Sequence, residues 1–192
     1  MKKMNHFVAT AALMLMFICT AGRGYAQTDS RGSLRLGIGI EAGAPTQNYT
    51  NLMLGGTAKL QYDLASSTSL TLTSGYYNLF TKNLPVADVT GGAKTQDIGI
   101  VPLKLGAKIF VAPNVYIHPE AGAAFSVRDR QEGKFAYYQK GAMLDAAAGI
   151  GYASDSGLDF SIRYEQFFKN ESKNLQSLGF VALRVAYAFK LL

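Results

Sequence analysis

Apolar and polar residues alternate along most of the chain with a period of two. Between residues 34 and 42, Leu, Ile and Ala occupy one parity, while Arg35, Glu41 and two glycines occupy the other. Successive side chains of a β-strand point to opposite faces, so this segment predicts a strand with two unlike faces. Seven further segments repeat the pattern: 54–63, 69–77, 97–110, 114–125, 144–152, 158–165 and 179–191. Because an open sheet leaves unpaired edges, these strands predict an all-β, eight-stranded antiparallel up-and-down barrel.

Two prolines interrupt the alternation. The apolar parity of the fourth segment changes at Val101 and Pro102. An extra residue shifts the phase of a strand, and proline cannot donate to the ladder, so we predict a β-bulge at this point. Pro119 stands in the middle of the fifth segment and weakens the prediction of a strand there.

The predicted connections alternate in length. Those after the first, third, fifth and seventh strands are long, at about 43–53, 78–96, 126–142 and 169–178, whereas those at 64–68, 111–113 and 154–157 are short. Barrels of the bacterial outer membrane have an even number of strands, short periplasmic turns and longer outer loops. The pattern therefore predicts a transmembrane barrel, with residues 27–192 as one domain.

Residues 1–26 predict a cleaved secretory signal peptide. Lys2 and Lys3 form a basic start, residues 8–18 an almost continuous apolar run, and Gly24-Tyr25-Ala26 a processing site. The run is about half of the ~20 residues that a transmembrane helix needs. Cleavage would lower the formal net charge of +6 by three and remove the single cysteine, so no disulfide is expected. The remaining cations are scattered among acids rather than gathered in a patch, which argues against a nucleic-acid partner.

The polar parity carries equal numbers of positive and negative side chains. They are Arg35, Lys59, Lys104, Lys108, Arg163 and Arg184 together with Glu41, Asp63, Glu120, Asp145, Asp159 and Glu165. Balanced charge suits a narrow interior, where buried charges must pair, and predicts a plugged polar bore held by this interior charge network. The alternative is a periplasmic soluble lipocalin-like barrel, which turns its apolar face inward around a hydrophobic ligand.

Aromatic residues stand near both ends of the apolar parity. Tyr76, Phe125 and Phe168 lie toward the predicted outer side, and Tyr62, Tyr152, Phe160, Tyr187 and Phe189 toward the periplasmic side. Membrane barrels carry aromatic girdles at both interfaces with water. This placement favours lipid, rather than a dry interior, as the neighbour of the apolar face.

Residues 32–192 resemble the small outer-membrane β-barrel proteins of the OmpX-like and OmpA-like kind. The resemblance is carried by the segment from Ile98 to Leu105, by Tyr116-Ile-His-Pro-Glu-Ala-Gly122 and by the final Tyr187-Ala-Phe189. It implies eight strands, export, and recognition of the terminal aromatic residue by the barrel assembly machinery. The chain departs from the pattern because Lys190-Leu191-Leu192 follows Phe189.

Candidate catalytic residues are few. His118 and Glu120 share the polar parity, and a lipid-modifying outer-membrane enzyme would need a serine within hydrogen-bond reach of such a pair. Ser126 shares the parity but lies eight residues further along the strand. We therefore predict a protein without enzymatic activity, with no catalytic residues, cofactor or metal site.

The third long connection combines cations with aromatic residues, namely Arg128, Arg130, Lys134 and Lys140 with Phe135, Tyr137 and Tyr138. Such a loop could contact lipopolysaccharide or an unknown surface partner, although a solvated loop is the simpler interpretation. The sequence thus predicts an outer-membrane protein with a structural or surface-interaction role.

Overall fold

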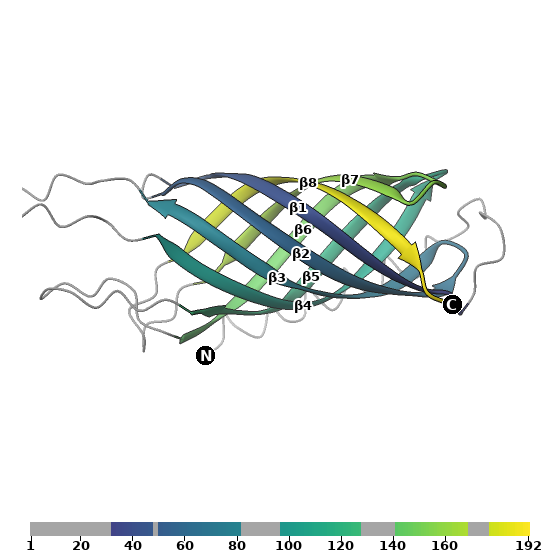
Figure 1. Cartoon of the computed structure of the whole chain (residues 1–192), viewed down its shortest axis with the longest axis horizontal. Coiled ribbons are helices and arrows are strands. Elements are labelled where there is room, and N and C mark those ends of the chain that lie inside the picture. The colour runs from purple at the N-terminus through teal and green to yellow at the C-terminus, as the bar shows by residue number, and fades with distance from the viewer. Residues whose placement is uncertain (1–31, 48–49, 82–96, 128–140, 169–176) are drawn as a thin grey trace, which may run out of the picture.

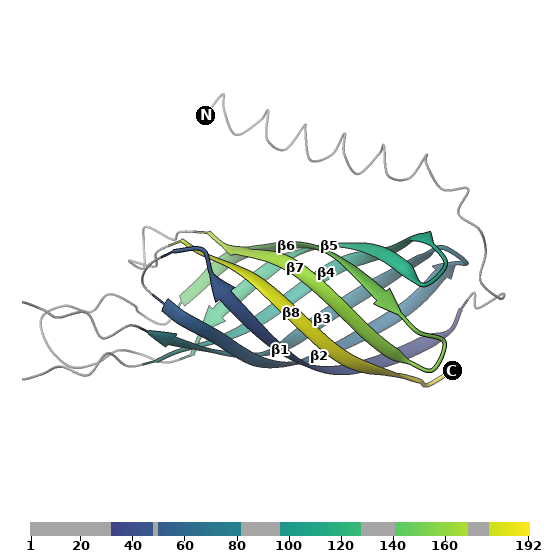
Figure 2. The ribbon, with the colours of Figure 1, turned by 90° about the horizontal axis from the view of Figure 1, so that it is seen from above.

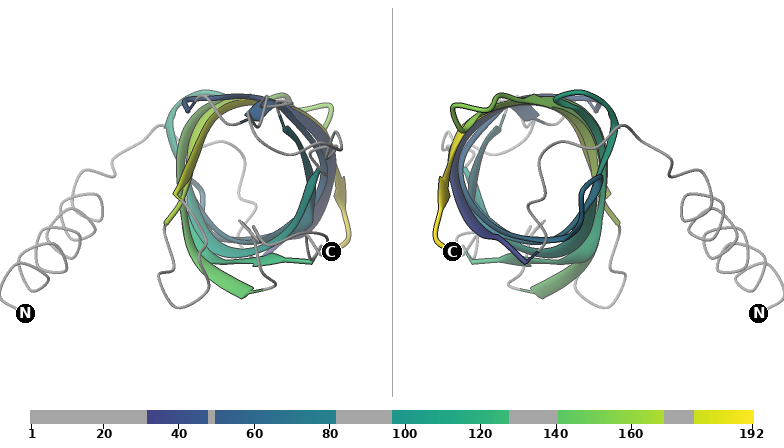
Figure 3. Two further views of the ribbon diagram at one scale, coloured as in Figure 1. Left: turned by 90° about the vertical axis from the view of Figure 1, so that its left-hand side faces the viewer. Right: turned by 90° about the vertical axis from the view of Figure 1, so that its right-hand side faces the viewer.

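The computed structural model describes residues 32–47, 50–81, 97–127, 141–168 and 177–192. They form eight strands: β1 (Leu34–Pro45), β2 (Thr50–Ala65), β3 (Thr68–Thr81), β4 (Ile98–Ala112), β5 (Val115–Ser126), β6 (Gly141–Ala153), β7 (Leu158–Phe167) and β8 (Leu178–Lys190). Each strand is antiparallel to its neighbours, and the sheet closes into a barrel in chain order (Figure 1; Figure 3). The predicted all-β architecture is confirmed. No helix in the described ranges is long and apolar enough to cross a membrane.

The barrel closes between β1 and β8. Their ladder runs from the pair Arg35 and Lys190 to the pair Pro45 and Phe180. Beyond it, the Leu34 amide donates to the Leu192 carbonyl at 3.2 Å, and the Leu191 amide donates to the Leu34 carbonyl at 2.8 Å. The start of β1 and the end of the chain therefore lie at the same end of the barrel as the short turns (Figure 2).

The connections differ from the prediction at one place. Those at 82–97, 127–140 and 168–177 are long, and those at 66–67, 113–114 and 154–157 are short. The first connection was predicted to be long but covers only residues 46–49. β1 and β2 extend beyond the segments that alternate most clearly in the sequence. Their ladder continues as far as the pair Gly43 and Met53.

The predicted β-bulge at Val101 and Pro102 is wrong. On the β3 side, the pairs Ser74 with Leu103 and Tyr77 with Ile100 enclose two residues on each strand, so the register does not shift. The pairing is interrupted only for those two residue pairs, since proline has no amide hydrogen to donate. Pro119 likewise lies within β5, where the ladder with β4 is interrupted without a shift in register.

The two faces of the wall have the polarity of a membrane barrel. Large apolar side chains point outward on all eight strands and are exposed, up to 72% at Ile40 and 71% at Leu144. The charged side chains of the same strands point inward and are almost all buried. This arrangement is the reverse of the soluble lipocalin-like alternative, in which the apolar face would line the interior.

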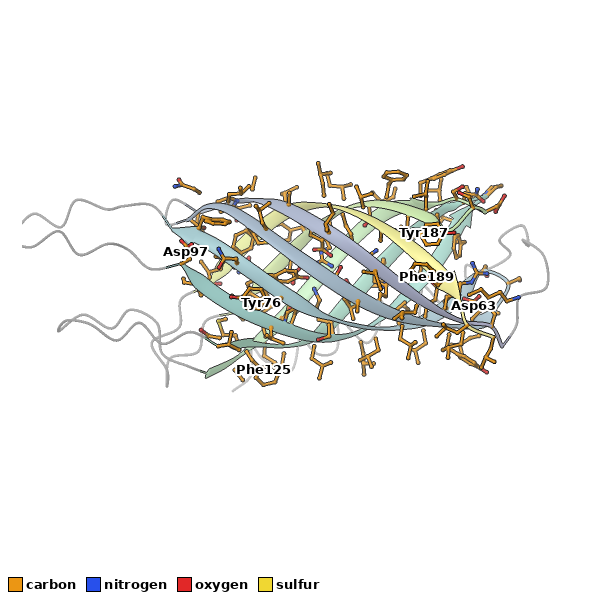
Figure 4. The ribbon with its side chains drawn as sticks, viewed as in Figure 1. Asp63, Tyr76, Asp97, Phe125, Tyr187 and Phe189 are labelled. Carbon is orange, nitrogen blue, oxygen red and sulfur yellow. The ribbon has the colours of Figure 1, made fainter. Side chains whose placement is uncertain are left out.

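Exposed aromatic side chains lie toward both ends of the outer face. Tyr76 and Phe125 lie toward the end with the long connections, and Tyr187 and Phe189 toward the end with the short turns (Figure 4). The rings of Tyr187 and Phe189 pack edge to face with centroids 4.8 Å apart. The outer face therefore offers aromatic side chains where a membrane barrel meets the two lipid–water interfaces.

The interior near the long connections is apolar rather than charged. We call this cluster the apolar core; its buried members are Met53, Tyr77, Leu79, Ile100, Ala124, Met143, Phe167, Leu178, Phe180 and Ala182. Phe167 and Phe180 pack edge to face with ring centroids 6.0 Å apart. The change of parity at Ile100 therefore reflects an inward apolar side chain and not an inserted residue.

Candidate functional site

The charged interior begins at the end of the barrel with the short turns, around Asp63. Its carboxylate accepts hydrogen bonds from Ser33 at 2.5 Å, Ser69 at 2.7 Å and Gln61 at 2.8 Å. Arg35 approaches it to 3.3 Å with a side chain that is 37% exposed, so this cation lies at the mouth of the barrel and not among the buried charges.

The next group surrounds Asp159. Lys108 contacts this carboxylate at 2.6 Å, the Tyr116 hydroxyl donates to it at 2.6 Å, and Arg184 lies at 3.7 Å. The Lys108 ammonium also lies 4.0 Å from the centre of the Tyr116 ring. A ring face attracts a cation most strongly where water is excluded, so Tyr116 stabilises Lys108 as well as Asp159.

His118 joins Lys59 to β3. Its Nδ1 lies 3.0 Å from the Lys59 ammonium and its Nε2 lies 2.9 Å from the Thr71 hydroxyl. An ammonium group can only donate, so Nδ1 is the acceptor and the proton of a neutral His118 ring is on Nε2. Glu120 lies 4.0 Å from Lys59 and accepts a hydrogen bond from Thr73 at 2.6 Å.

Arg163 is the centre of the charged interior. Its guanidinium contacts Glu165 at 2.5 Å, Glu41 at 2.6 Å and Glu120 at 3.2 Å, and it donates to the Tyr77 hydroxyl. The planar guanidinium offers five donors, which allows one cation on β7 to bridge carboxylates on three strands.

Two further cations complete the balance of charge. Lys104, which is fully buried, contacts Glu165 at 2.6 Å and Asp145 at 3.7 Å. Arg184 reaches Glu41 at 3.3 Å, and its Nε donates to Thr57 at 3.0 Å.

Glycines on the inner face make room for these long side chains. A Cβ at Gly149 would lie 2.7 Å from the Cβ of Arg163, and one at Gly106 would lie 2.7 Å from the Cγ of Glu120. Both distances are too short for a real side chain, so the charged residues occupy the space that these two glycines leave free.

The structure places most of the charged residues predicted from the sequence inside the barrel. Eleven of the twelve charged residues are buried inside the barrel, and Arg35 lies at its mouth. The structure brings Arg163, Glu165 and Lys104 together, with Asp145 beside Lys104. The loop residues Arg128, Arg130, Lys134, Tyr137 and Tyr138, and the predicted signal peptide, lie outside the described residues.

His118 and Ser126 are far apart. Eight residues of extended strand separate them, which corresponds to about 26 Å. Both ring nitrogens of His118 face Lys59 and Thr71, and the nearest His118–Glu120 contact is 3.7 Å. The described part of the chain also contains no group of three or more His, Cys, Asp or Glu residues that could hold a metal ion.

Reasoning from the sequence missed two parts of the interior. It missed the apolar core, although Met53, Leu79, Phe167 and Phe180 stand on the polar parity of their strands and could have indicated it. It also missed the hydroxyl groups that bind the buried charges. No sequence signal distinguishes those hydroxyls from the other hydroxyl residues of the strands.

Comparison with known proteins shows the fold. No protein-family model matches the chain, and no curated protein matches it significantly. Among solved structures, the attachment invasion locus protein Ail of Yersinia pestis, in a phospholipid bilayer nanodisc, is 15% identical with a TM-score of 0.53, covering 83% of this chain and 100% of that one. The N-terminal β-barrel domain of Pseudomonas aeruginosa OprF is 16% identical with a TM-score of 0.51, covering 83% and 98%.

Proposed function

From the fold of the small eight-stranded outer-membrane barrels, which this chain shares, we propose that the protein resides in the bacterial outer membrane and acts there as a structural and surface-interaction protein. The exposed apolar outer face carries the proposal. Side chains such as Ile40, Leu105, Leu144 and Leu183 are 60–72% exposed on a barrel whose charges point inward. Water would disfavour such a continuous apolar surface, whereas lipid hydrocarbon is an equally apolar neighbour.

The interior supports a closed bore. Eight strands leave room for little more than side chains, and here the charges around Arg163 occupy one part of the length and the apolar core another. A hydrated ion would have to displace paired charges and then cross apolar side chains. We therefore propose a plugged scaffold rather than a channel, and we expect no steady conductance in a planar bilayer.

The location can be tested with trypsin added to intact cells. The connection at 127–140 contains Arg128, Arg130, Lys134 and Lys140, whereas the short turns contain no Lys or Arg. We expect cleavage at the long connections before the cells are permeabilised, and a folded form that shifts in migration when heated in detergent. Cleavage only after permeabilisation, or a protein that is soluble without detergent, would contradict the proposal.

The surface role can be tested on the same connection. We propose that Arg128, Arg130 and Lys134, with Tyr137 and Tyr138, contact anionic lipopolysaccharide at the outer leaflet. A variant with these three cations changed to Gln should bind more weakly than the parent to vesicles that contain lipopolysaccharide, and equally to neutral phospholipid vesicles. Equal binding of both proteins to lipopolysaccharide would reject this contact.

A further inference from the structure

The wall of the barrel has a gap in its ladder between β3 and β4. We call the facing segments Ser74–Tyr77 and Ile100–Leu103 the β3–β4 seam. Pairing is interrupted here at Gly75 and Tyr76, opposite Val101 and Pro102, whereas the ladders between β5, β6, β7 and β8 are continuous along their paired lengths. Since Pro102 has no amide hydrogen, it cannot supply its share of the ladder bonds.

Side chains replace ladder bonds at the seam. The Ser74 hydroxyl donates to the Pro102 carbonyl at 3.0 Å. The Tyr76 ring crosses the outside of the seam onto β4, because a Cβ on Gly99 would lie 2.6 Å from its hydroxyl oxygen and 3.2 Å from its Cζ. The Tyr76 side chain starts at the gap, ends over Gly99 and is 39% exposed on the outer face (Figure 4).

The inner side of the seam is the apolar core. Tyr77 and Ile100 flank the gap and are fully buried within that cluster. Pro102 pairs with Ala124, which pairs in turn with Met143, so one row of residues leads from the seam to a flexible thioether. The gap at Pro119 is different, because Lys108 and His118 lie on its inner side and both make polar contacts there.

We propose that the β3–β4 seam is a lateral opening in the barrel wall, covered by Tyr76, through which the end of a lipid acyl chain enters the apolar core. The ligand class follows from the surroundings. A hydrocarbon chain that moves from lipid to apolar side chains keeps an apolar environment, whereas a charged molecule would lose its hydration. The methionine side chains at the site adapt their shape to such a chain, and few backbone hydrogen bonds must break.

A single buried thiol tests the route. In a Cys19→Ser background, Met143→Cys places the only thiol of the chain in the apolar core, where Met143 is 2% exposed. The protein is refolded into phospholipid vesicles, and the reagents are a long-chain alkyl maleimide dissolved in the lipid and a sulfonated maleimide in the water. The proposal depends on the lipid contact proposed above. Heat-modifiable migration tests that contact separately, before any labelling.

Two opposite changes are expected in the rate of labelling by the alkyl maleimide. Pro102→Val restores an amide donor and should slow labelling about fivefold, the equivalent of one net hydrogen bond of about 1 kcal/mol. Tyr76→Ala removes the cover and should speed labelling by a similar factor. The matched controls are Pro119→Val at the other gap and Phe125→Ala, an outward aromatic residue that is 41% exposed, and neither should change the rate.

The outcomes separate the seam from other routes. Equal labelling by the sulfonated reagent would mean entry from water at the long connections and would overturn the proposal. So would a rate that Pro102→Val and Tyr76→Ala leave unchanged, or that the controls alter equally. If Pro102→Val does not refold, Pro102→Ala also restores the amide and must slow labelling in the same way.

Discussion

Replacing Arg163 by leucine should destabilise the folded barrel more than any other single change to an interior cation. The substitution removes the one group that contacts Glu41, Glu120 and Glu165 together, and it also removes a donor to Tyr77. It leaves the six buried carboxylates with four buried cations instead of five. Removing one partner of a buried ion pair costs about 3–5 kcal/mol.

The remaining partners place the expected loss within that range. Glu41 keeps Arg184 at 3.3 Å, Glu165 keeps Lys104 at 2.6 Å, and Glu120 keeps its hydrogen bond from Thr73. No carboxylate is left without a polar contact, so the free energy of unfolding should fall by about 3 kcal/mol, near the lower limit for a broken buried pair.

The free energy of unfolding can be measured by urea titration in phospholipid vesicles. Circular dichroism and heat-modifiable migration are suitable signals, because the chain has no tryptophan. The matched control is Arg35→Leu, which removes a cation of the same type whose side chain is 37% exposed at the mouth. An exposed pair contributes about 0–1 kcal/mol, so this variant should stay close to the parent. If Arg163→Leu unfolds at the same urea concentration as Arg35→Leu, the ion pairs around Arg163 do not stabilise the barrel.

Three further predictions concern the wall and the interior. Leu72→Arg, on the outer face of β3, should lower the free energy of unfolding by about 2–4 kcal/mol if that position meets hydrocarbon, while Leu64→Arg near the end of β2 should lower it by only about 0–1 kcal/mol. Equal small losses in the same urea titration would mean that water surrounds the barrel. Gly122→Ala should destabilise by about 1–3 kcal/mol, because its Cβ would lie 2.8 Å from the Lys104 Cα, whereas Gly56→Ala has no atom nearer than 4.0 Å and should stay within about 0.5 kcal/mol of the parent. The loss caused by Arg163→Leu should be the same at about 0.05 and 0.5 M salt, since buried pairs are screened little; a loss that disappears at high salt would place Arg163 in contact with water.

The alternation of residues predicted the strands, the closure and the direction of most side chains. It did so because the side-chain period of a strand is two whatever the neighbouring strand is. It could not predict which charges meet, since that depends on the stagger between strands. Arg163 and Glu41, for example, form a pair across 122 positions of sequence.

The errors came from local features whose effect depends on the closed barrel. Ile100 changes the apolar parity, and a bulge was a reasonable inference from the sequence, but the residue points into the apolar core in unchanged register. The first connection appeared long because residues 43–45 and 50–53 alternate weakly. All of them except Asn51 still pair, because β8 continues beside residues 43–45 and β3 beside residues 50–53.

The pairing of β1 with β8 has a consequence for how the molecule is made. Arg35 of β1 pairs with Lys190 of β8. One edge of β1 therefore has no hydrogen-bonding partner until β8 has been synthesised. Joining such distant segments is slow, because the entropy of a very large loop is lost before any contact between them forms. Until then two strand edges have unpaired backbone groups, and the polypeptide needs protection from aggregation until these edges pair.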